Sequence, residues 1–498
     1  MLRSRWTWIG PCVAGALLWT VGAAHRSLWT DEFHSLHHVR APDWSAFLVA
    51  VRTDNHPPLG FALQRLSVLA FGESELALRL PGVLAGIALV ALATRLAARL
   101  PGRAAPRVAP WLVACSSYTF LIATEARMYA WLALAVLGLA VAVLEELEGR
   151  AGAPARVPPR WQACAWIAVG FHAHYYFLHD LWLIGLSTVA AVAWKRELAA
   201  RAAGLLLPAS VAALLCLPWA CWGFFPQLFH DLPAGGNYHG LGIWLQSLAH
   251  LAFLNASLGG RFVTYGVALP GAVLLALLLV GGTLRLARTP HARLPLLFLL
   301  ALAVGVPAWS YGASCVWTRA AYGWPYLAGS EVPLLCLAAA GAGGSTARWL
   351  AGTALAGTML AVALVGAAWG GTEDYRTAVE LVLAEARPGD AVVVKPLWEL
   401  EPERSPTGWD YYAERASPAI ALAVIPVAEL ERARQHDRVW VMIRDQHSPW
   451  ILRALRRSFQ RERRWRLGPS LDLHLFSEPR AAPAGQRTAP PRPALTGA

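Results

Sequence analysis

Long apolar runs recur along most of this chain and limit what it can fold into. Each is about 17–25 residues long, the length that an α-helix needs to cross the ~30 Å hydrocarbon core of a bilayer. Of the 498 residues, 56% are hydrophobic and only 15% are charged, with a mean hydropathy of +0.42. A soluble protein would carry nearer to about a quarter charged residues. We therefore predict an all-α polytopic membrane protein with about 11 transmembrane helices.

Basic residues indicate how the runs are threaded through the membrane. The net charge is +12, but the arginines recur between apolar runs rather than on one basic surface. This is the pattern of cytoplasmic loops under the positive-inside rule, and it argues against nucleic acid as a partner. Residues 6–24 are expected to be an uncleaved anchor, and Leu59 to Phe71 an interfacial helix. The expected crossings are residues 6–24, 80–100, 108–124, 128–144, 161–176, 181–194, 202–223, 263–284, 294–311, 320–342 and 349–369.

The hydropathy changes near residue 370 and divides the chain. Residues 1–370 are expected to form a transmembrane module, with a first outer loop at 25–78. Residues 371–480 are predicted to be a small extracytoplasmic α/β domain, and the Pro-, Ala- and Arg-rich tail 481–498 to be disordered. The charge count then predicts a multi-pass protein of the cell inner (plasma) membrane, with its C-terminal domain outside.

Within the C-terminal domain, hydropathy patterns predict alternating helices and strands. Residues 372–387 and 427–435 have helical spacing, and a Pro-Gly-Asp sequence ends the first of them. Residues 391–394 and 438–443 read as short buried strands.

Two polar groups stand out in the first outer loop. The acids Asp31 and Glu32 follow the first crossing, and His56 stands before two prolines that fix its backbone direction. Carboxylates beside a bilayer are costly, so they tend to be functional or paired. An acid here could take a proton from an acceptor hydroxyl or amine, whereas the plain alternative is a solvated loop pair.

Further candidates lie at the outer ends of later crossings. Arg127 could clamp a phosphate, or it could extend to the lipid headgroups. The histidine-rich stretch from 172 to Asp180 resembles a metal site, although its i, i+2 spacing differs from that of a zinc-binding helix. We expect it to line a substrate cavity instead. The candidate substrate-binding residues are His56, Glu125, Arg127, His174, Tyr175, Arg319 and Tyr322.

Four motifs together resemble one superfamily. They are the acid pair at 31–32, His-Pro-Pro-Leu at 56–59, Phe-Gly-Glu-Ser-Glu-Leu-Ala-Leu-Arg-Leu-Pro-Gly at 71–82 and Glu-Ala-Arg-Met-Tyr-Ala at 125–130. This combination resembles the GT-C superfamily, and specifically the family 39-like membrane glycosyltransferases. That group includes protein O-mannosyltransferases and the aminoarabinose transferase that modifies lipid A. The resemblance covers residues 6–370.

The resemblance implies an inverting hexosyl- or pentosyltransferase of the cell envelope, fed by a polyprenyl-phosphate-linked sugar. It implies that Asp31 is the catalytic base, with Glu32 beside it, and that the acceptor is an extracytoplasmic lipid, glycan or protein. Many relatives carry an Arg-Tyr pair near an outer segment end, where this chain has Arg319-Ala-Ala-Tyr322.

Cofactors and other functions are left open by the sequence. No cofactor is required by the resemblance, although a divalent metal could assist. Two alternatives are a transporter or flippase of lipid-linked sugars and a non-catalytic envelope scaffold. A transporter more often shows paired inverted halves with polar groups at mid-membrane, and no such halves repeat here.

Overall fold

The computed structural model describes residues 7–149, 157–229, 241–252, 263–316, 323–368, 373–394, 408–416, 422–444, 449–468 and 470–480. The chain divides into two compact units. One comprises Met1–Ser27 and Asp31–Gly371, and the other comprises Leu28–Thr30 and Thr372–Ala498.

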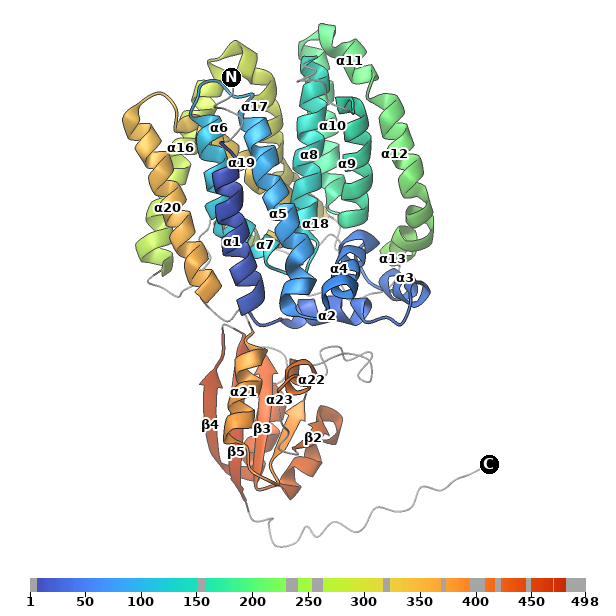
Figure 1. Ribbon diagram of the computed structural model, residues 1–498, viewed down its shortest axis with the longest axis vertical. Helices are drawn as coiled ribbons and strands as arrows, with labels where there is room; N and C mark the ends of the chain where they lie inside the picture. Colours follow the sequence, from blue (N-terminus) through green and yellow to red (C-terminus); the bar gives the residue numbers. More distant parts are fainter. Residues whose placement is uncertain are drawn as a thin grey trace. The chain divides into compact units, whose positions relative to one another are not determined.

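The first unit is a bundle of apolar helices, as predicted (Figure 1). In the described part of the chain, seven helices or helical stretches are long and apolar enough to cross a membrane. The expected crossings at 6–24, 161–176 and 320–342 coincide with shorter helices. The described helices of the bundle are α1 (Ile9–His25), α5 (Glu75–Ala97), α6 (Ala105–Cys115), α7 (Ser117–Ala123), α8 (Tyr129–Glu148), α9 (Pro159–Ala173), α10 (Phe177–Trp194), α11 (Ala199–Ala203), α12 (Leu206–Trp219), α13 (Phe225–Phe229), α14 (Leu241–Leu251), α16 (Leu269–Ala287), α17 (Arg293–Leu300), α18 (Val306–Val316), α19 (Ala328–Gly341) and α20 (Thr346–Ala368).

One expected crossing, 108–124, is broken in the middle. Ser116 has an extended backbone between α6 and α7, and its hydroxyl accepts hydrogen bonds from the N–H groups of Tyr118 and Thr119. The side chains of Ser116 and Thr119 both donate to the buried carboxylate of Glu331 on α19. Backbone N–H groups exposed by the break are thus hydrogen-bonded by a side chain inside the bundle, without the need for water.

Helix α8 is the most enclosed of the candidate spans, with 89% of its apolar window buried. Arginines gather at its C-terminal end. Arg95 of α5 and Arg99, just beyond the end of α5, both pair with Glu145, and Arg99 also pairs with Glu148. The opposite end begins at Tyr129, directly after the predicted Glu-Ala-Arg motif. The 20 residues of α8 span about 30 Å. The arginine–glutamate pairs at its C-terminal end and the Glu-Ala-Arg motif before its N-terminal end are therefore one bilayer thickness apart.

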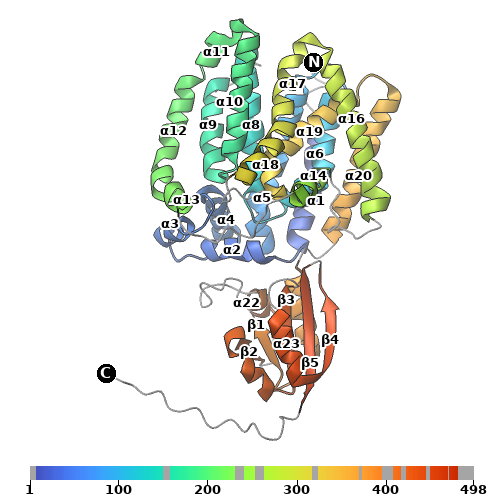
Figure 2. The same ribbon diagram turned by 180° about the vertical axis from the view of Figure 1, so that it is seen from behind.

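Three short helices follow α1 and lie near one end of the bundle in both views (Figures 1 and 2). They are α2 (Thr30–Val39), α3 (Trp44–Arg52) and α4 (Pro58–Phe71). Helix α4 covers the segment expected to be interfacial, and its 14 residues extend only about 21 Å. Its exposed side chains include Leu66, Leu69 and Phe71. This length and exposure fit a helix that lies at the bilayer surface.

The second unit contains a five-stranded sheet in the order β2-β1-β3-β5-β4. Strand β1 pairs in parallel with β2 and β3, whereas β5 pairs antiparallel with β3 and β4. The strands are β1 (Ala391–Val394), β2 (Ala423–Pro426), β3 (Arg438–Arg444), β4 (Phe459–Arg466) and β5 (Leu471–Pro479), and the helices are α21 (Tyr375–Glu385), α22 (Gly408–Ala413), the 3-10 helix Val427–Gln435 and α23 (Pro449–Ser458).

The predicted α/β character of this unit is confirmed, together with the two strands and two helical segments expected from sequence. A tight turn at Pro388-Gly389-Asp390 ends the first helical region, since Gly389 has a φ of +90° and the Asp390 N–H donates to the Arg387 carbonyl at 3.0 Å. Strands β2, β4 and β5 were not predicted from the sequence. The exposed arginines of β4 mask its strand pattern because it is an edge strand, where charge prevents further pairing.

Candidate functional site

A buried ion pair fixes helix α2 in the first unit. The guanidinium of Arg79 on α5 donates to both carboxylate oxygens of Glu32, at 2.7 and 2.5 Å. Arg79 also donates to the carbonyls of Ala23, Arg26 and Ser27. Both charged side chains are almost fully buried. Glu32 is therefore held as an acceptor, with its charge matched inside the protein.

The turn between α7 and α8 is bound to the same face of α2. The Ala126 N–H donates to Glu32 at 2.6 Å, and the Ser35 hydroxyl donates to the Ala126 carbonyl at 2.8 Å. Helix α5 approaches this turn closely at Gly82, where an added Cβ would lie 2.9 Å from the Ala123 carbonyl oxygen. The motifs at 31–32, 71–82 and 125–130 thus meet in one place.

Asp31 differs from its neighbour Glu32 in its surroundings. It is half-buried in the first turn of α2, and its carboxylate has no hydrogen bond or ion pair to any residue that the structure describes. Its backbone carbonyl accepts from Arg127 at 3.2 Å. The Asp31 charge is close enough to act electrostatically on Glu125 and Arg127. Of the two acids, Asp31 is the one with a carboxylate available to another molecule.

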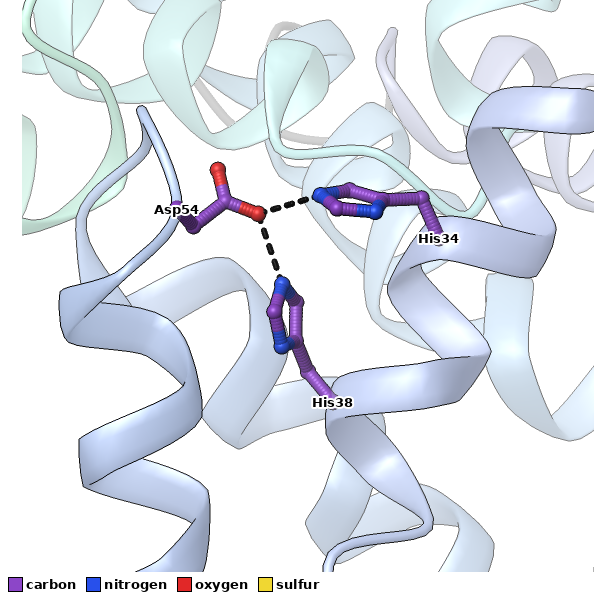
Figure 3. A group of neighbouring side chains, drawn as sticks. All are labelled: His34, His38 and Asp54. Carbon is purple, nitrogen blue, oxygen red and sulfur yellow. Dashed lines mark hydrogen bonds and ion pairs between the residues drawn. The ribbon is translucent and has the colours of Figure 1, made fainter. Parts of the chain in front are cut away.

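Asp54 organises the end of the first loop, although the sequence did not single it out. One of its oxygens, Oδ2, accepts from Nε2 of His34 at 2.5 Å and Nε2 of His38 at 2.6 Å (Figure 3). The other, Oδ1, accepts from Nδ1 of His56 at 2.9 Å and from the N–H groups of Asn55 and His56. Burial alone would raise the pKa of Asp54, but hydrogen bonds from these three histidines hold it well below its usual value.

This network sets the tautomer of His56. Because Nδ1 donates to Asp54, Nε2 carries a lone pair, and it faces Nη2 of Arg127 at 3.3 Å. Burial and the nearby Arg127 charge both lower the pKa of His56, which agrees with a neutral ring. The His56 ring, held in place by Asp54, therefore helps to position the guanidinium of Arg127.

Arg127 and Glu125 complete the polar group. Arg127 is 5% exposed, and its Nη1 also donates to the Ser35 hydroxyl at 3.4 Å. Glu125 is 4% exposed, and its Oε2 has no hydrogen-bond partner among the described residues. Burial raises the pKa of Glu125 to about 8, with the nearby Arg26 opposing this effect. At neutral pH the site therefore holds a neutral acid, Glu125, close to the cationic side chain of Arg26.

His174 borders this group, at the end of α9. Its ring lies 5.3 Å from that of His56 and 5.4 Å from that of Tyr326, between ring centroids. Its Nδ1 accepts from the Tyr176 N–H at 3.1 Å, so Nε2 carries the proton, and Nε2 has no partner in the described part of the chain. Burial holds the pKa of His174 well below its usual value. His174 thus presents a buried N–H donor among aromatic rings.

Tyr175 points to different partners. Its hydroxyl donates to Gln227 and accepts from the Trp219 ring N–H at 2.9 Å. Gln227 in turn donates to the carbonyls of Val51 and His56. Through Gln227, Tyr175 therefore stabilises the backbone of the first loop, and its hydroxyl does not contact Arg127.

Two candidates from sequence, Arg319 and Tyr322, lie outside the described residues. The remaining ones from the histidine-rich stretch have other surroundings. His172 donates to the carbonyl of its own helix at Ala168, and Asp180 is fully buried on α10. Among the described residues, the one set of three metal-type ligands is instead His34, His38 and Asp54. The i, i+4 spacing of His34 and His38 was a signal that could have found it.

Comparisons with known proteins identify the fold. No family model and no curated protein matches the sequence. A crystal structure of ArnT from Cupriavidus metallidurans bound to undecaprenyl phosphate matches with a TM-score of 0.58 and 15% identity, over 94% of this chain and 98% of that one. The apo form of the same protein matches with a TM-score of 0.50 and 14% identity, over 94% and 97% of the two chains.

A second solved protein has a related architecture. The apo oligosaccharyltransferase from Archaeoglobus fulgidus matches with a TM-score of 0.50 and 13% identity, over 77% of this chain and 58% of that one. Both solved proteins are membrane glycosyltransferases of one superfamily. The chain therefore has the fold of the GT-C membrane glycosyltransferases.

Proposed function

We propose that this protein is a membrane glycosyltransferase that moves a sugar from a polyprenyl-phosphate-linked donor to an extracytoplasmic acceptor. The observation that carries the proposal is the contrast between Asp31 and Glu32. Glu32 is buried and fully paired, whereas the adjacent Asp31 carboxylate is half-buried and has no bonded partner in the described part of the chain. The GT-C fold, shared with a protein solved with undecaprenyl phosphate, supports the donor class.

The proposed reaction needs one base and one anion-stabilising group. Asp31 takes the proton from the acceptor hydroxyl or amine, whose heteroatom then bonds to the anomeric carbon. The bond from that carbon to the phosphate oxygen breaks, and the polyprenyl phosphate leaves with the electron pair. Attack opposite the leaving group inverts the anomeric configuration.

Arg127 is suited to the leaving phosphate. Its guanidinium is held by the Asp31 carbonyl, the Ser35 hydroxyl and His56, so it is already oriented before substrate arrives. A fixed cation in a site with little water stabilises developing negative charge strongly. Its distances to these partners, 3.2 to 3.4 Å, are long for charge-assisted bonds and leave donor capacity for phosphate oxygens.

The neighbouring residues receive different roles. Glu32 is a positioning residue, because its carboxylate is saturated by Arg79 and the Ala126 N–H. Glu125, neutral at pH 7, and His174 each offer a buried polar atom that could meet a sugar hydroxyl. Tyr175 supports the first loop.

We also propose that this end of the bundle faces the outside of the inner (plasma) membrane. The arginine-rich end of α8 lies one bilayer thickness away, and the positive-inside rule assigns it to the cytoplasm. On this basis residues 1–370 form the transferase module and residues 371–480 an extracytoplasmic domain.

Mass spectrometry of cell-envelope lipids, glycans and proteins tests the proposed function. Cells with and without the gene should differ by species that carry one added sugar residue. Expression of the wild-type chain should restore these species, whereas Arg127→Gln should not. An unchanged envelope in cells lacking the chain, with its donor lipid present, would exclude this activity.

A further inference from the structure

We infer that His34, His38 and Asp54 form a binding site for one divalent transition-metal ion, with zinc the ion that best fits the donors. The site lies beside the proposed catalytic groups. The inference does not depend on sugar transfer, because metal binding can be measured whether or not the chain is a transferase.

The donor atoms already converge. One nitrogen from each of His34 and His38 and one oxygen of Asp54 all lie within 4.8 Å of one another. The two histidines are one turn apart on α2, an arrangement that directs both rings to the same side of a helix. Figure 3 shows both Nε2 atoms turned toward the same oxygen of Asp54, which comes from the turn before α4.

The geometry needs only a small change to accept an ion. Zinc binds imidazole nitrogen and carboxylate oxygen at about 2.0–2.2 Å, so tetrahedral ligand atoms lie roughly 3.3 Å apart. The Nε2 atoms now lie 2.5 and 2.6 Å from Oδ2. Rotation of the imidazoles makes room for the ion if it opens each of these distances by less than about 1 Å and brings the two nitrogens, which lie within 4.8 Å of each other, to roughly 3.3 Å. Each ring would also shift its proton from Nε2 to Nδ1, which leaves it neutral.

The surroundings hold the carboxylate ligand in place. Oδ1 of Asp54 is bonded by His56 and by two backbone N–H groups, so Oδ2 remains directed at the histidines. Such outer hydrogen bonds orient metal ligands and raise affinity. The Asp54 side chain is fully buried and that of His38 is 4% exposed, whereas that of His34 is 26% exposed. The ion therefore has access from one side, and three ligands leave a fourth position open.

The ion would stabilise the helix face that carries the proposed base. Asp31, His34 and His38 are spaced i, i+3 and i+7 on α2, so they share one face. Joining that face to Asp54 would fix α2 against the turn that holds His56, and through His56 the position of Arg127. The metal is thus assigned a positioning role.

Zinc content of the purified full-length protein tests the inference. The detergent-solubilised chain is stripped with chelator, incubated with zinc chloride, desalted and analysed by inductively coupled plasma mass spectrometry. We expect one zinc per chain, with affinity at least ~10-fold lower in His34→Ala, His38→Ala and Asp54→Asn. His37→Ala is the matched control, because it removes a histidine of the same helix that is not in the donor set. Equal zinc content in the control and the ligand variants, or none in the wild type, would overturn the site.

A second measurement needs no variant and remains valid if the substitutions unfold the chain. Diethylpyrocarbonate modifies imidazoles, and peptide mass spectrometry locates the modified histidines. Zinc should protect His34 in the wild-type protein and leave the exposed His291 unchanged. Equal modification of His34 with and without zinc would contradict the inference.

Discussion

Arg79 binds both carboxylate oxygens of Glu32, at 2.7 and 2.5 Å, with the two side chains 1% and 0% exposed. This pair joins α2 to α5 and presents Asp31, the residue before Glu32, at the site. A charge left unpaired at such depth is strongly unfavourable.

The first prediction concerns stability at this pair. Glu32→Ala should lower the free energy of unfolding by about 3–5 kcal/mol, because the Arg79 guanidinium loses its counter-ion inside the protein. Glu73→Ala is the control, since its ion pair with Arg40 is partly exposed and should contribute less than ~1 kcal/mol. Thermal unfolding midpoints in detergent measure both. Similar losses of stability in the two variants would show that the buried pair contributes no more to folding than the partly exposed one.

The second prediction concerns Glu125 and pH. Its folded pKa of about 8 exceeds the usual 4.5, so its contribution to stability is complete below 4.5 and is lost as the pH rises through 8. Glu125→Gln keeps a neutral side chain at every pH. The unfolding midpoint of Glu125→Gln relative to wild type should therefore rise between about pH 5 and pH 8 and then level off. A constant difference across this range would mean that Glu125 titrates normally.

The third prediction separates charge from geometry at Arg127. Arg127→Lys keeps the positive charge but loses the planar set of donors that contacts Asp31, Ser35 and His56. Arg127→Gln loses both. We expect kcat to fall by about 10²–10³-fold in Arg127→Gln, with Arg127→Lys intermediate and KM changing less. An effect confined to KM would assign Arg127 to ground-state binding instead.

The fourth prediction concerns orientation in the membrane. Thr53 and Ala200 are both exposed, near the site end and the arginine-rich end respectively. In a chain whose exposed Cys221 and Cys315 are replaced by serine, a membrane-impermeant thiol reagent should label Thr53→Cys in intact cells. Ala200→Cys should react only after the membrane is opened. The reverse pattern would invert the proposed topology.

Much of this architecture could be predicted because apolar runs and interspersed arginines reflect the bilayer itself. The helix that follows Glu125 and Arg127 and the strands Ala391–Val394 and Arg438–Arg444 follow directly from hydropathy. The break at Ser116 could not be predicted, because it depends on Glu331, which is 215 residues away. Strands β2, β4 and β5 were also missed, and β4 in particular carries few apolar residues because it is an edge strand.

The motifs that meet at the candidate site could be recognised in the sequence, but the different surroundings of its individual residues could not. Neighbouring acids look alike in a sequence, and only the contact with Arg79 distinguishes Glu32 from Asp31. Asp54 was overlooked because its importance comes from three histidines that converge on it from two segments.

The most direct test of the central claim compares sugar transfer by Asp31→Asn with that by wild type and by Glu73→Gln, at equal amounts of protein in the membrane. Asn is similar in size to Asp but cannot accept the proton. Transfer should fall by at least about 10²-fold in Asp31→Asn and stay near the wild-type rate in Glu73→Gln. Wild-type rates in both Asp31→Asn and Asp31→Ala would show that Asp31 is not the base.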